Sequence, residues 1–256
     1  MPSTSARTTR PRSPDLSALR DLAPSAGILL DFDGSLAEIV ARPELARPVE
    51  GAREVLGALV ERYRVVAIVT GRRSEEIAAM LDVPGVRLLG VYGLEDGDHE
   101  RVSEALLERV RSAARVVPVA WVEDKGAAAA VHYRAAPDHV AAREALTRRL
   151  APLADAEGME LVQGKMVLEL MPTDRPRKGG AALRLADELG LHGVLFAGDD
   201  VADLEAFDAL GRLASRGALV IRVAVRGAET PVALLDHADV VVEGPLGLVD
   251  LLRALA

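Results

Sequence analysis

Acidic side chains follow two apolar runs of this sequence, in positions where they could hold a metal ion between them. The run at 26–30 leads into Asp31 and Asp33, and a later apolar run leads into Asp199 and Asp200. Residues two apart on an extended strand point the same way, so Asp31 and Asp33 both project from the end of the first run. Carboxylates this close repel each other unless a divalent cation or a shared proton relieves the repulsion. Mg²⁺ favours oxygen ligands of this kind, so if both strands lie centrally in one parallel sheet, we expect it between Asp31, Asp33 and Asp199, with Asp203 as a further candidate.

Each acidic motif also has a simpler interpretation. A lone Asp-x-Asp motif is common as an acidic turn at the end of a strand. Asp199 or Asp200 could instead cap the helix expected at 201–210, with Asp203 near its first turn. Capping and metal ligation can coexist in one motif.

A hydroxyl and two cations add phosphate-binding chemistry. Thr70-Gly71-Arg72 follows another apolar run and offers a hydroxyl and backbone N–H groups at a helix start, which suits a phosphate oxygen. Lys178 opens a further predicted helix, where its ammonium could bridge a carboxylate and a phosphoryl group. In an arginine-rich chain, Arg72 could equally be a solvated surface charge, and Lys178 a surface lysine. Taken together, the groups suit phosphoryl transfer, with a carboxylate nucleophile and an acid/base.

The elements that would position these groups alternate in type along the chain. Strands are expected at 26–30, 64–70, 86–91, 194–197 and 218–225, and helices at 50–62, 74–81, 178–189 and 201–210. This alternation predicts an α/β fold with a parallel sheet covered by helices.

The middle of the chain departs from that alternation. Strand-like runs at 116–123 and 128–134, a helix at 138–153 and a hairpin formed by 160–162 and 166–170 predict an inserted α+β unit. We therefore expect three parts: a flexible tail at 1–14, a core domain at 15–97 and 175–256, and an inserted domain at 98–174.

Composition excludes several classes of protein. Half of the 256 residues are apolar and the net charge is −8, which argues against a disordered chain or a nucleic-acid-binding protein. No run approaches the roughly 18 apolar residues of a membrane span. With no cysteine there is neither a disulfide framework nor a thiolate nucleophile. We expect a cytoplasmic monomer that acts on a small molecule.

The chemistry-bearing segments resemble, in order, the four motifs of the haloacid dehalogenase superfamily. The segments are Asp31-Phe32-Asp33-Gly34-Ser35, Thr70-Gly71-Arg72, Lys178, and Gly198-Asp199-Asp200 with Asp203. The resemblance implies a Rossmann-like parallel-sheet core with an inserted α+β cap domain that specifies the substrate. Ser35 stands where the superfamily usually has threonine, and it keeps the hydroxyl.

The same resemblance implies a role for each motif residue. Asp31 would be the nucleophile, and Asp33 the general acid/base that also offers a backbone oxygen to Mg²⁺. Thr70 would bind the phosphoryl group, Lys178 would steady Asp31, and Asp199 would complete the metal site. Asp200 and Asp203 would lie in or beside that site.

Three segments of the insertion are similar to the cap of trehalose-6-phosphate phosphatases, and Gly93-Leu94-Glu95 is similar to another part of that family. The segments are Glu123-Asp124-Lys125-Gly126, His132-Tyr133-Arg134, and Gly164-Lys165 with Glu169. The resemblance implies substrate-binding roles for Arg72, Glu123, Lys125, His132, Arg134 and Glu169. One departure is that Val201-Ala202-Asp203 lacks the threonine that often follows Gly-Asp-Asp in the family. By strand alternation alone, the polar cap residues could form an ordinary solvated face of an antiparallel sheet.

The leading hypothesis is Mg²⁺-dependent hydrolysis of trehalose 6-phosphate through a phosphoaspartyl intermediate. An alternative is a related phosphatase acting on another sugar phosphate, such as a glucosylated or mannosylated acid. From other classes, a phospho-receiver module or a non-catalytic sugar-phosphate sensor would use similar residues. Receiver modules, however, are much shorter and carry no such insertion.

Overall fold

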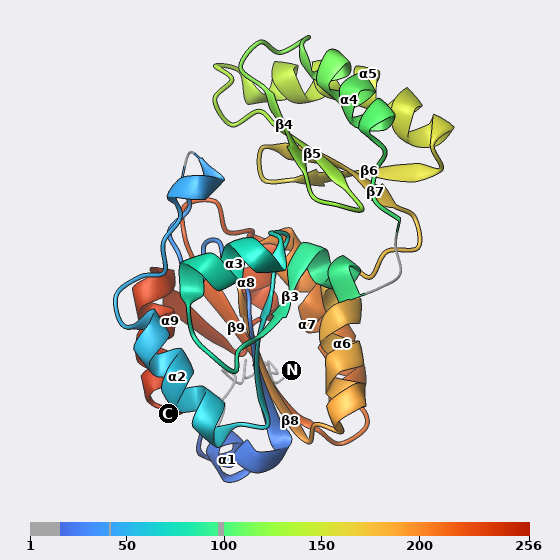
Figure 1. Ribbon diagram of the computed structural model, residues 1–256. Helices are drawn as coiled ribbons and strands as arrows, with labels where there is room; N and C mark the ends of the chain where they lie inside the picture. Colours follow the sequence, from blue (N-terminus) through green and yellow to red (C-terminus); the bar gives the residue numbers. More distant parts are fainter. Residues whose placement is uncertain (1–15, 41, 97–99) are drawn as a thin grey trace, which may run out of the picture.

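Two sheets, one parallel and one antiparallel, organise the part of the chain that the structure describes (Figure 1). The computed structural model describes residues 16–40, 42–96 and 100–256, so the tail expected at 1–14 lies outside the described residues. The parallel sheet contains, in spatial order, β10 (Val240–Glu243), β9 (Leu219–Arg226), β8 (Gly193–Gly198), β1 (Ala26–Leu30), β2 (Val65–Val69) and β3 (Arg87–Leu89). Every neighbouring pair in it is parallel, which confirms the predicted α/β class.

Strand alternation divides the apolar side chains of the parallel sheet between two cores. In β1, Ile28 and Leu30 point to one core and Leu29 points to the other. The first face is covered by α1 (Leu16–Asp21), α2 (Ala52–Arg62), α3 (Ser74–Leu81) and α9 (Gly244–Arg253); the second is covered by α6 (Lys178–Leu189), α7 (Val201–Ala214) and α8 (Val232–His237). A sheet buried on both faces explains why its strands read as continuous apolar runs. Within the described ranges, none of the helices combines the length and the hydropathy of a membrane span.

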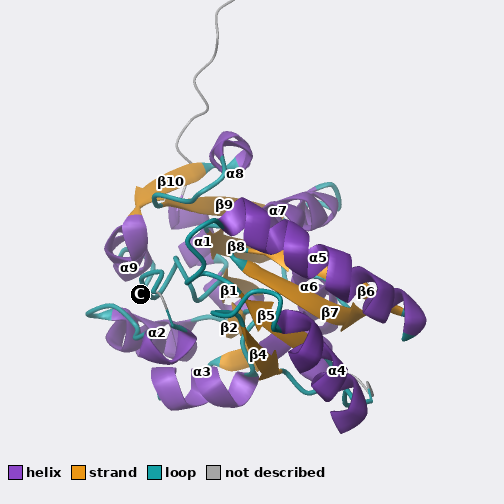
Figure 2. Ribbon diagram, turned by 90° about the horizontal axis from the view of Figure 1, so that it is seen from above, coloured by secondary structure: helices purple, strands orange, loops and turns teal. Residues whose placement is uncertain are grey.

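The antiparallel sheet lies above the parallel one and is covered by helices on one face only (Figures 1 and 2). Its order is β4 (Trp121–Asp124), β5 (Ala129–His132), β7 (Val167–Pro172) and β6 (Met159–Gly164), and its helices are α4 (Glu104–Ala114) and α5 (His139–Ala156). Val131 and Leu168 pack with Leu146 and Leu150 of α5 in a separate core. The opposite face of this sheet is turned toward the parallel unit.

Three short 3-10 segments connect these elements: η1 (Ala23–Ser25), η2 (Pro43–Leu45) and η3 (Gly90–Asp96). The third replaces the end of the strand expected at 86–91, because Val91 and Tyr92 adopt positive φ angles of 47° and 58°. A left-handed backbone cannot continue a strand ladder.

The strand expected at 116–123 begins only at Trp121. Residues 116–120 form turns, in which Val117 N–H donates to Ala114 O and Ala120 N–H to Val117 O. Pro118 lies in this segment and has no N–H to donate to a sheet ladder, which is the physical reason for the later start.

Removing apolar volume between α5 and the antiparallel sheet should lower the stability of that sheet. Leu146→Ala opens a cavity at a fully buried position of α5, and we expect a loss of about 2–5 kcal/mol of unfolding free energy. Hydrogen exchange of the β5 and β7 amides measures this loss. Val140→Ala, at an exposed position of the same helix, is the matched control. Equal protection in the two variants would contradict the packing of Leu146 against Val131 and Leu168.

Candidate active site

Three adjacent strands end at the same edge of the parallel sheet, and each is followed by a polar site residue. The neighbours β8, β1 and β2 lead into Asp199, Asp31 and Thr70, respectively. A backbone hydrogen bond from Asp31 N to Ala197 O, 2.9 Å long, extends the β1–β8 pairing to this edge. The carboxyl edge of a parallel sheet is where open α/β folds bind ligands.

A buried lysine joins two buried carboxylates at this edge. Lys178, at the start of α6, is 3% exposed, and its Nζ lies 2.5 Å from both Asp31 Oδ1 and Asp203 Oδ1. The other oxygen of Asp203 accepts backbone N–H groups of Asp199 and Asp200 at 2.9 and 2.8 Å. An ammonium is compact enough to neutralise two carboxylates at once, whereas a guanidinium is a planar fork. This position therefore favours lysine over arginine, although 28 of the 31 lysine and arginine residues of the chain are arginines.

Two glycines let the backbone approach this cluster. Gly34 has a φ of +85°, and a Cβ built on it would lie 2.2 Å from Asp199 Oδ2. A Cβ on Gly198 would lie 2.0 Å from Asp203 Cγ. Both distances are shorter than any real contact, so a side chain at either position would displace a carboxylate of the cluster.

The cluster has the donors that a divalent cation needs. Ligand oxygens of Asp31, Asp199 and Asp203 lie within 4.8 Å of one another. Asp31 Oδ2 and Asp199 Oδ1 are buried with no hydrogen-bond partner, as is Ser35 Oγ. Burying an unpaired carboxylate oxygen is costly, and a cation between the two would remove that cost. Because Asp203 already contacts Lys178 and two backbone N–H groups, Asp31 and Asp199 are the side chains best placed to hold a metal.

Burial and mutual repulsion change the ionisation of these groups. Burial raises the pKa of the Asp31 carboxyl well above its usual range; Lys178 opposes this rise, and the charges of Asp203 and Asp199 add to it. Burial also raises the pKa of Asp199 to about 6, although Lys165 lowers it. Burial lowers the pKa of Lys178, but the carboxylates of Asp203 and Asp31 overcome this effect and leave it raised. A cation beside Asp31 and Asp199 would favour their ionised forms.

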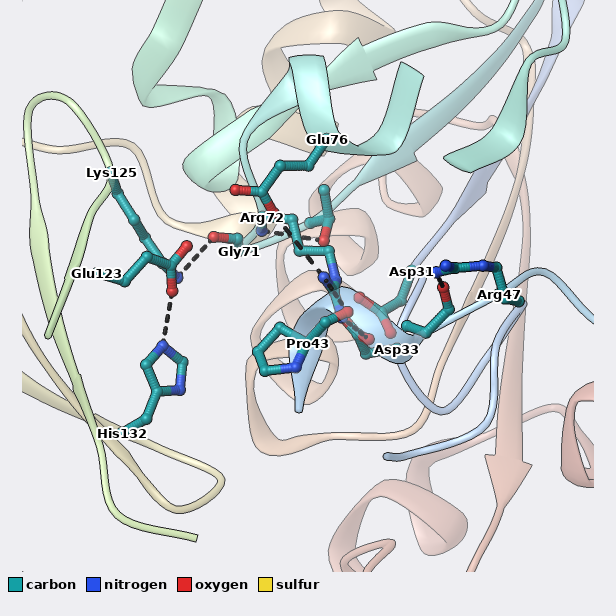
Figure 3. Close-up of polar contacts among 12 residues, drawn as sticks. Asp31, Asp33, Pro43, Arg47, Gly71, Arg72, Glu76, Glu123, Lys125 and His132 are labelled. Carbon is teal, nitrogen blue, oxygen red and sulfur yellow. Dashed lines mark hydrogen bonds and ion pairs between the residues drawn. The ribbon is translucent and has the colours of Figure 1, made fainter. Parts of the chain in front are cut away.

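The side chains of Asp33 and Asp200 turn away from the cluster. Both oxygens of Asp33 accept from Arg72, with Nε and Nη2 each at 2.7 Å (Figure 3). Asp200 Oδ1 accepts the N–H of Val201 at 2.5 Å and caps α7. The capping interpretation therefore describes the side chain of Asp200. A backbone oxygen of Asp33 as a metal donor stays a prediction.

The Thr70-Gly71-Arg72 turn is held by the left-handed segment after β3. Thr70 is buried, and its Oγ1 accepts the N–H of Arg72 at 3.2 Å. Tyr92 N–H donates to Thr70 O and Val91 N–H donates to Arg72 O, each at 2.8 Å. A β-branched residue such as Val91 rarely adopts a positive φ, and such strain is typical of functional sites.

Two polar pairs lie on the face of the antiparallel sheet that is free of helices. His132 Nε2 and Glu123 Oε2 are 2.6 Å apart, and Lys125 Nζ donates to Glu169 Oε1 at 2.7 Å. Figure 3 shows His132, Glu123 and Lys125 across from Asp31 and Asp33. Burial lowers the pKa of Lys125, but the carboxylates of Glu169 and Glu123 leave it raised.

Three cations of the antiparallel unit reach acceptors of the parallel unit. Lys125 Nζ donates to Gly71 O at 2.8 Å, and Arg134 Nη1 lies 3.2 Å from Glu229 Oε1. Lys165 Nζ is 2.5 Å from Asp199 Oδ2. These contacts hold the two units together over the carboxylate cluster.

A cavity of about 530 Å³ separates the two walls and has the size of a small-molecule site. The residues predicted from the sequence all line it: Asp31, Asp33, Thr70, Arg72, Glu123, Lys125, His132, Arg134, Glu169, Lys178, Asp199 and Asp200. Carboxylates, a hydroxyl and a buried ammonium thus meet in one hollow with paired polar groups. That combination suits the binding and transfer of a phosphoryl group on a polar organic molecule.

Comparison with known sequences decides the family. The sequence model of the family described as trehalose-phosphatase matches residues 29–233, which contain every motif discussed above. The chain belongs to the trehalose-phosphatase family. The match spans all four motif segments and the whole insertion, and it confirms the trehalose-phosphatase resemblance seen in the sequence.

Mycobacterial relatives match most of the chain. A trehalose-phosphate phosphatase of Mycobacterium marinum is 31% identical over 207 residues, which cover 73% of this chain and 52% of that protein. A Mycobacterium tuberculosis protein described as an uncharacterized glycosyl hydrolase is 36% identical over 204 residues, 72% of this chain and 15% of its own length. The chain therefore spans about half of the first relative and a small part of the second.

Solved structures share the fold. The C-terminal domain of the Candida albicans trehalose-6-phosphate phosphatase has a TM-score of 0.77 at 21% identity, covering 97% of this chain and 98% of that one. A haloacid dehalogenase-like hydrolase from Bacteroides thetaiotaomicron has a TM-score of 0.65 at 14% identity, covering 91% and 100%. The parallel core and its insertion are therefore a known trehalose-phosphatase and haloacid dehalogenase-like arrangement.

Among the cavity side chains that were not assigned as site residues from the sequence, Lys165 and Trp121 contact predicted site residues. Lys165 follows β6 at a hairpin turn and reaches Asp199, and Trp121 stacks on His132. Strand alternation could have found Trp121, because it lies two residues before Glu123 on the same face. Nothing in the sequence fixes the partner of Lys165, because that contact joins two separate units.

Removing the buried cation should destabilise the cluster. Lys178→Met leaves the Asp31 and Asp203 carboxylates buried without their counter-charge, so we expect the unfolding free energy to fall by about 3–5 kcal/mol. Urea unfolding with EDTA present measures the change. Arg177→Met, at the exposed neighbouring position, should stay within about 0.5 kcal/mol. Similar midpoints for both variants would contradict the bridging role of Lys178.

Proposed function

We propose that this protein is a Mg²⁺-dependent phosphatase that hydrolyses trehalose 6-phosphate to trehalose and phosphate. The observation that carries the proposal is the buried Lys178 between Asp31 and Asp203, with Asp31 Oδ2 left unpaired in the cavity. Family membership and the names of the mycobacterial relatives support trehalose 6-phosphate as the substrate.

Asp31 is suited to act as the nucleophile because its two oxygens have different surroundings. Lys178 holds Oδ1, which fixes the carboxylate, while Oδ2 has no partner. Thr70 and the turn at Gly71 offer a hydroxyl and N–H groups to the phosphoryl oxygens. When bound by Asp31 and Asp199, Mg²⁺ would supply positive charge that keeps these carboxylates ionised and offsets the charge of the phosphate.

The reaction would proceed in two displacements at phosphorus. Asp31 Oδ2 attacks the phosphorus, the bond from phosphorus to the sugar oxygen breaks, and that oxygen takes a proton from Asp33. A water molecule then gives a proton to Asp33, and the oxygen of that water attacks the same phosphorus. The bond from phosphorus to Asp31 Oδ2 breaks, which releases phosphate and frees Asp31. Because Arg72 occupies both oxygens of Asp33, this role requires Asp33 to turn from Arg72 toward the substrate.

We also propose residues 98–174 as the cap domain that specifies the sugar. Glu123 is fixed by His132, and Lys125 and Glu169 fix each other, so these side chains present oriented donors and acceptors to sugar hydroxyls. Arg134 lines the same cavity and would add another donor. The three cationic contacts between the units would close the cap and exclude water during the reaction.

Phosphate release from a substrate panel tests the proposal. With Mg²⁺, we expect kcat/KM for trehalose 6-phosphate to exceed that for glucose 6-phosphate and sucrose 6-phosphate by at least about tenfold, because an enzyme discriminates between substrates by its contacts with the parts in which they differ, which here are the sugars. EDTA should abolish release. Equal kcat/KM for the three esters would contradict trehalose 6-phosphate as the substrate.

Replacing the nucleophile tests the assignment of Asp31. Asp31→Asn removes the attacking oxygen anion, so phosphate release should fall by at least about 10³-fold. Asp236→Asn, on the exposed face of α8, is the matched control and should keep the parent rate. An active Asp31→Asn enzyme would assign the nucleophile to another residue.

A further inference from the structure

The cavity contains the only tryptophan of the sequence. Trp121 begins β4, lines the cavity and is 41% exposed. It lies on the sheet face that carries Glu123 and Lys125, opposite the face that packs on α4 and α5. Large aromatic side chains are usually well buried, so an indole left open at a binding cavity calls for a ligand explanation.

The indole is held in a fixed orientation. Trp121 is paired with His132 across β4 and β5, and their rings stack with centroids 4.0 Å apart and planes at 10°. His132 in turn contacts Glu123 at 2.6 Å. One face of the indole is therefore covered by the imidazole. Within the part of the chain that the structure describes, no second ring and no guanidinium stacks on the other face.

The cavity has chemically different parts. Asp31, Lys178 and Asp199 form the charged part, whereas Ile39 and Val119 also line the cavity and are more than a third exposed. His132, on which the indole stacks, lies across from Asp31 and Asp33 in Figure 3. A ligand whose phosphate lies at Asp31 would therefore have to reach across the cavity to contact Trp121.

We propose that Trp121 is a specificity-determining residue that binds the sugar ring without the phosphate. One face of a pyranose ring carries mainly C–H bonds, and such a face packs on an aromatic surface while the hydroxyls at the ring edge keep their hydrogen bonds. Glu123, already fixed by His132, lies on the same sheet face to accept those hydroxyls. The His132 ring behind the indole keeps it in place before the sugar arrives, which lowers the entropic cost of binding.

This inference rests on the proposed function and deepens it. If Trp121 stacks on the unphosphorylated ring, the protein selects a disaccharide phosphate by contact with the ring farther from the reaction. The contribution belongs to binding, so it should appear in KM more than in kcat.

Kinetics of variants at this position give the first test. We expect Trp121→Leu to raise KM for trehalose 6-phosphate by roughly tenfold and to leave kcat within about twofold of the parent. Trp121→Phe keeps a flat ring, so its KM should lie between those of the parent and the Leu variant. Turnover of acetyl phosphate, which has no sugar ring, is measured in parallel to report an intact phosphoryl site. Val116→Ala, an exposed apolar residue outside the cavity, is the matched control.

Fluorescence gives a second test that needs no turnover. Because Trp121 is the only tryptophan, the indole emission of Asp31→Asn reports that ring alone. Adding trehalose 6-phosphate should change the emission saturably, and glucose 6-phosphate at the same concentrations should not. This comparison stays valid even if the Leu variant folds poorly.

The outcomes separate the two claims. If the parent hydrolyses trehalose 6-phosphate but KM is the same in all variants and the emission is unchanged, the role of Trp121 is overturned and the proposed function stands. If the parent hydrolyses acetyl phosphate but not trehalose 6-phosphate, both are overturned. A tenfold rise in KM in the Leu variant together with saturable emission supports the stacking contact.

Discussion

Like charges gathered at one edge of a buried sheet are the constraint on which this structure depends. Because β1 and β8 are parallel neighbours, the residues that follow them, Asp31 and Asp199, have carboxylate oxygens within 4.8 Å of each other. Isolated carboxylates in such a place would lose hydration without compensation. Lys178, at the start of α6, replaces part of the lost hydration by pairing with Asp31 and Asp203, and two backbone N–H groups donate to Asp203 as well. The unpaired oxygens on Asp31 and Asp199 are where the compensation is incomplete, and that is where we propose the metal and the reaction.

The antiparallel unit adds further positive charge near these carboxylates. Its lysines and Arg134 point down toward acceptors of the parallel unit, and one of them, Lys165, reaches Asp199 itself. In the proposed function, these cations would exchange their contacts for those of an anionic substrate. Beyond them, the antiparallel unit carries paired polar groups and the open ring of Trp121, which suit the sugar that we propose.

Much of this arrangement could be predicted from the sequence because it follows from strand geometry. Strand ends predict that Asp31 and Asp199 meet if both of their strands lie centrally in one parallel sheet, and the structure brings the two residues to one cavity. Asp200 is different: whether it ligates or caps depends on the exact phase of the first turn of α7, which a sequence does not specify. The bidentate contact of Arg72 with Asp33 is likewise a matter of side-chain rotamers.

The insertion was harder to predict for identifiable reasons. Pro118 lies in an apolar segment that reads as a strand, yet it can donate no ladder hydrogen bond, so β4 begins later. The helix α4 was not predicted, although Ser103 gives a capping signal and its Oγ accepts the N–H of Leu106. Contacts between the two units, such as Lys165 with Asp199, join segments far apart in sequence and leave no periodic signal.

The most direct test of the central claim is to trap the covalent intermediate. Enzyme turning over trehalose 6-phosphate with Mg²⁺ is quenched with borohydride, which reduces an aspartyl phosphate to homoserine, and the modified position is located by peptide mass spectrometry. We expect homoserine at position 31, dependent on both substrate and Mg²⁺. Modification at Asp33 or Asp199 instead, or full turnover with Asp31 never modified, would contradict it.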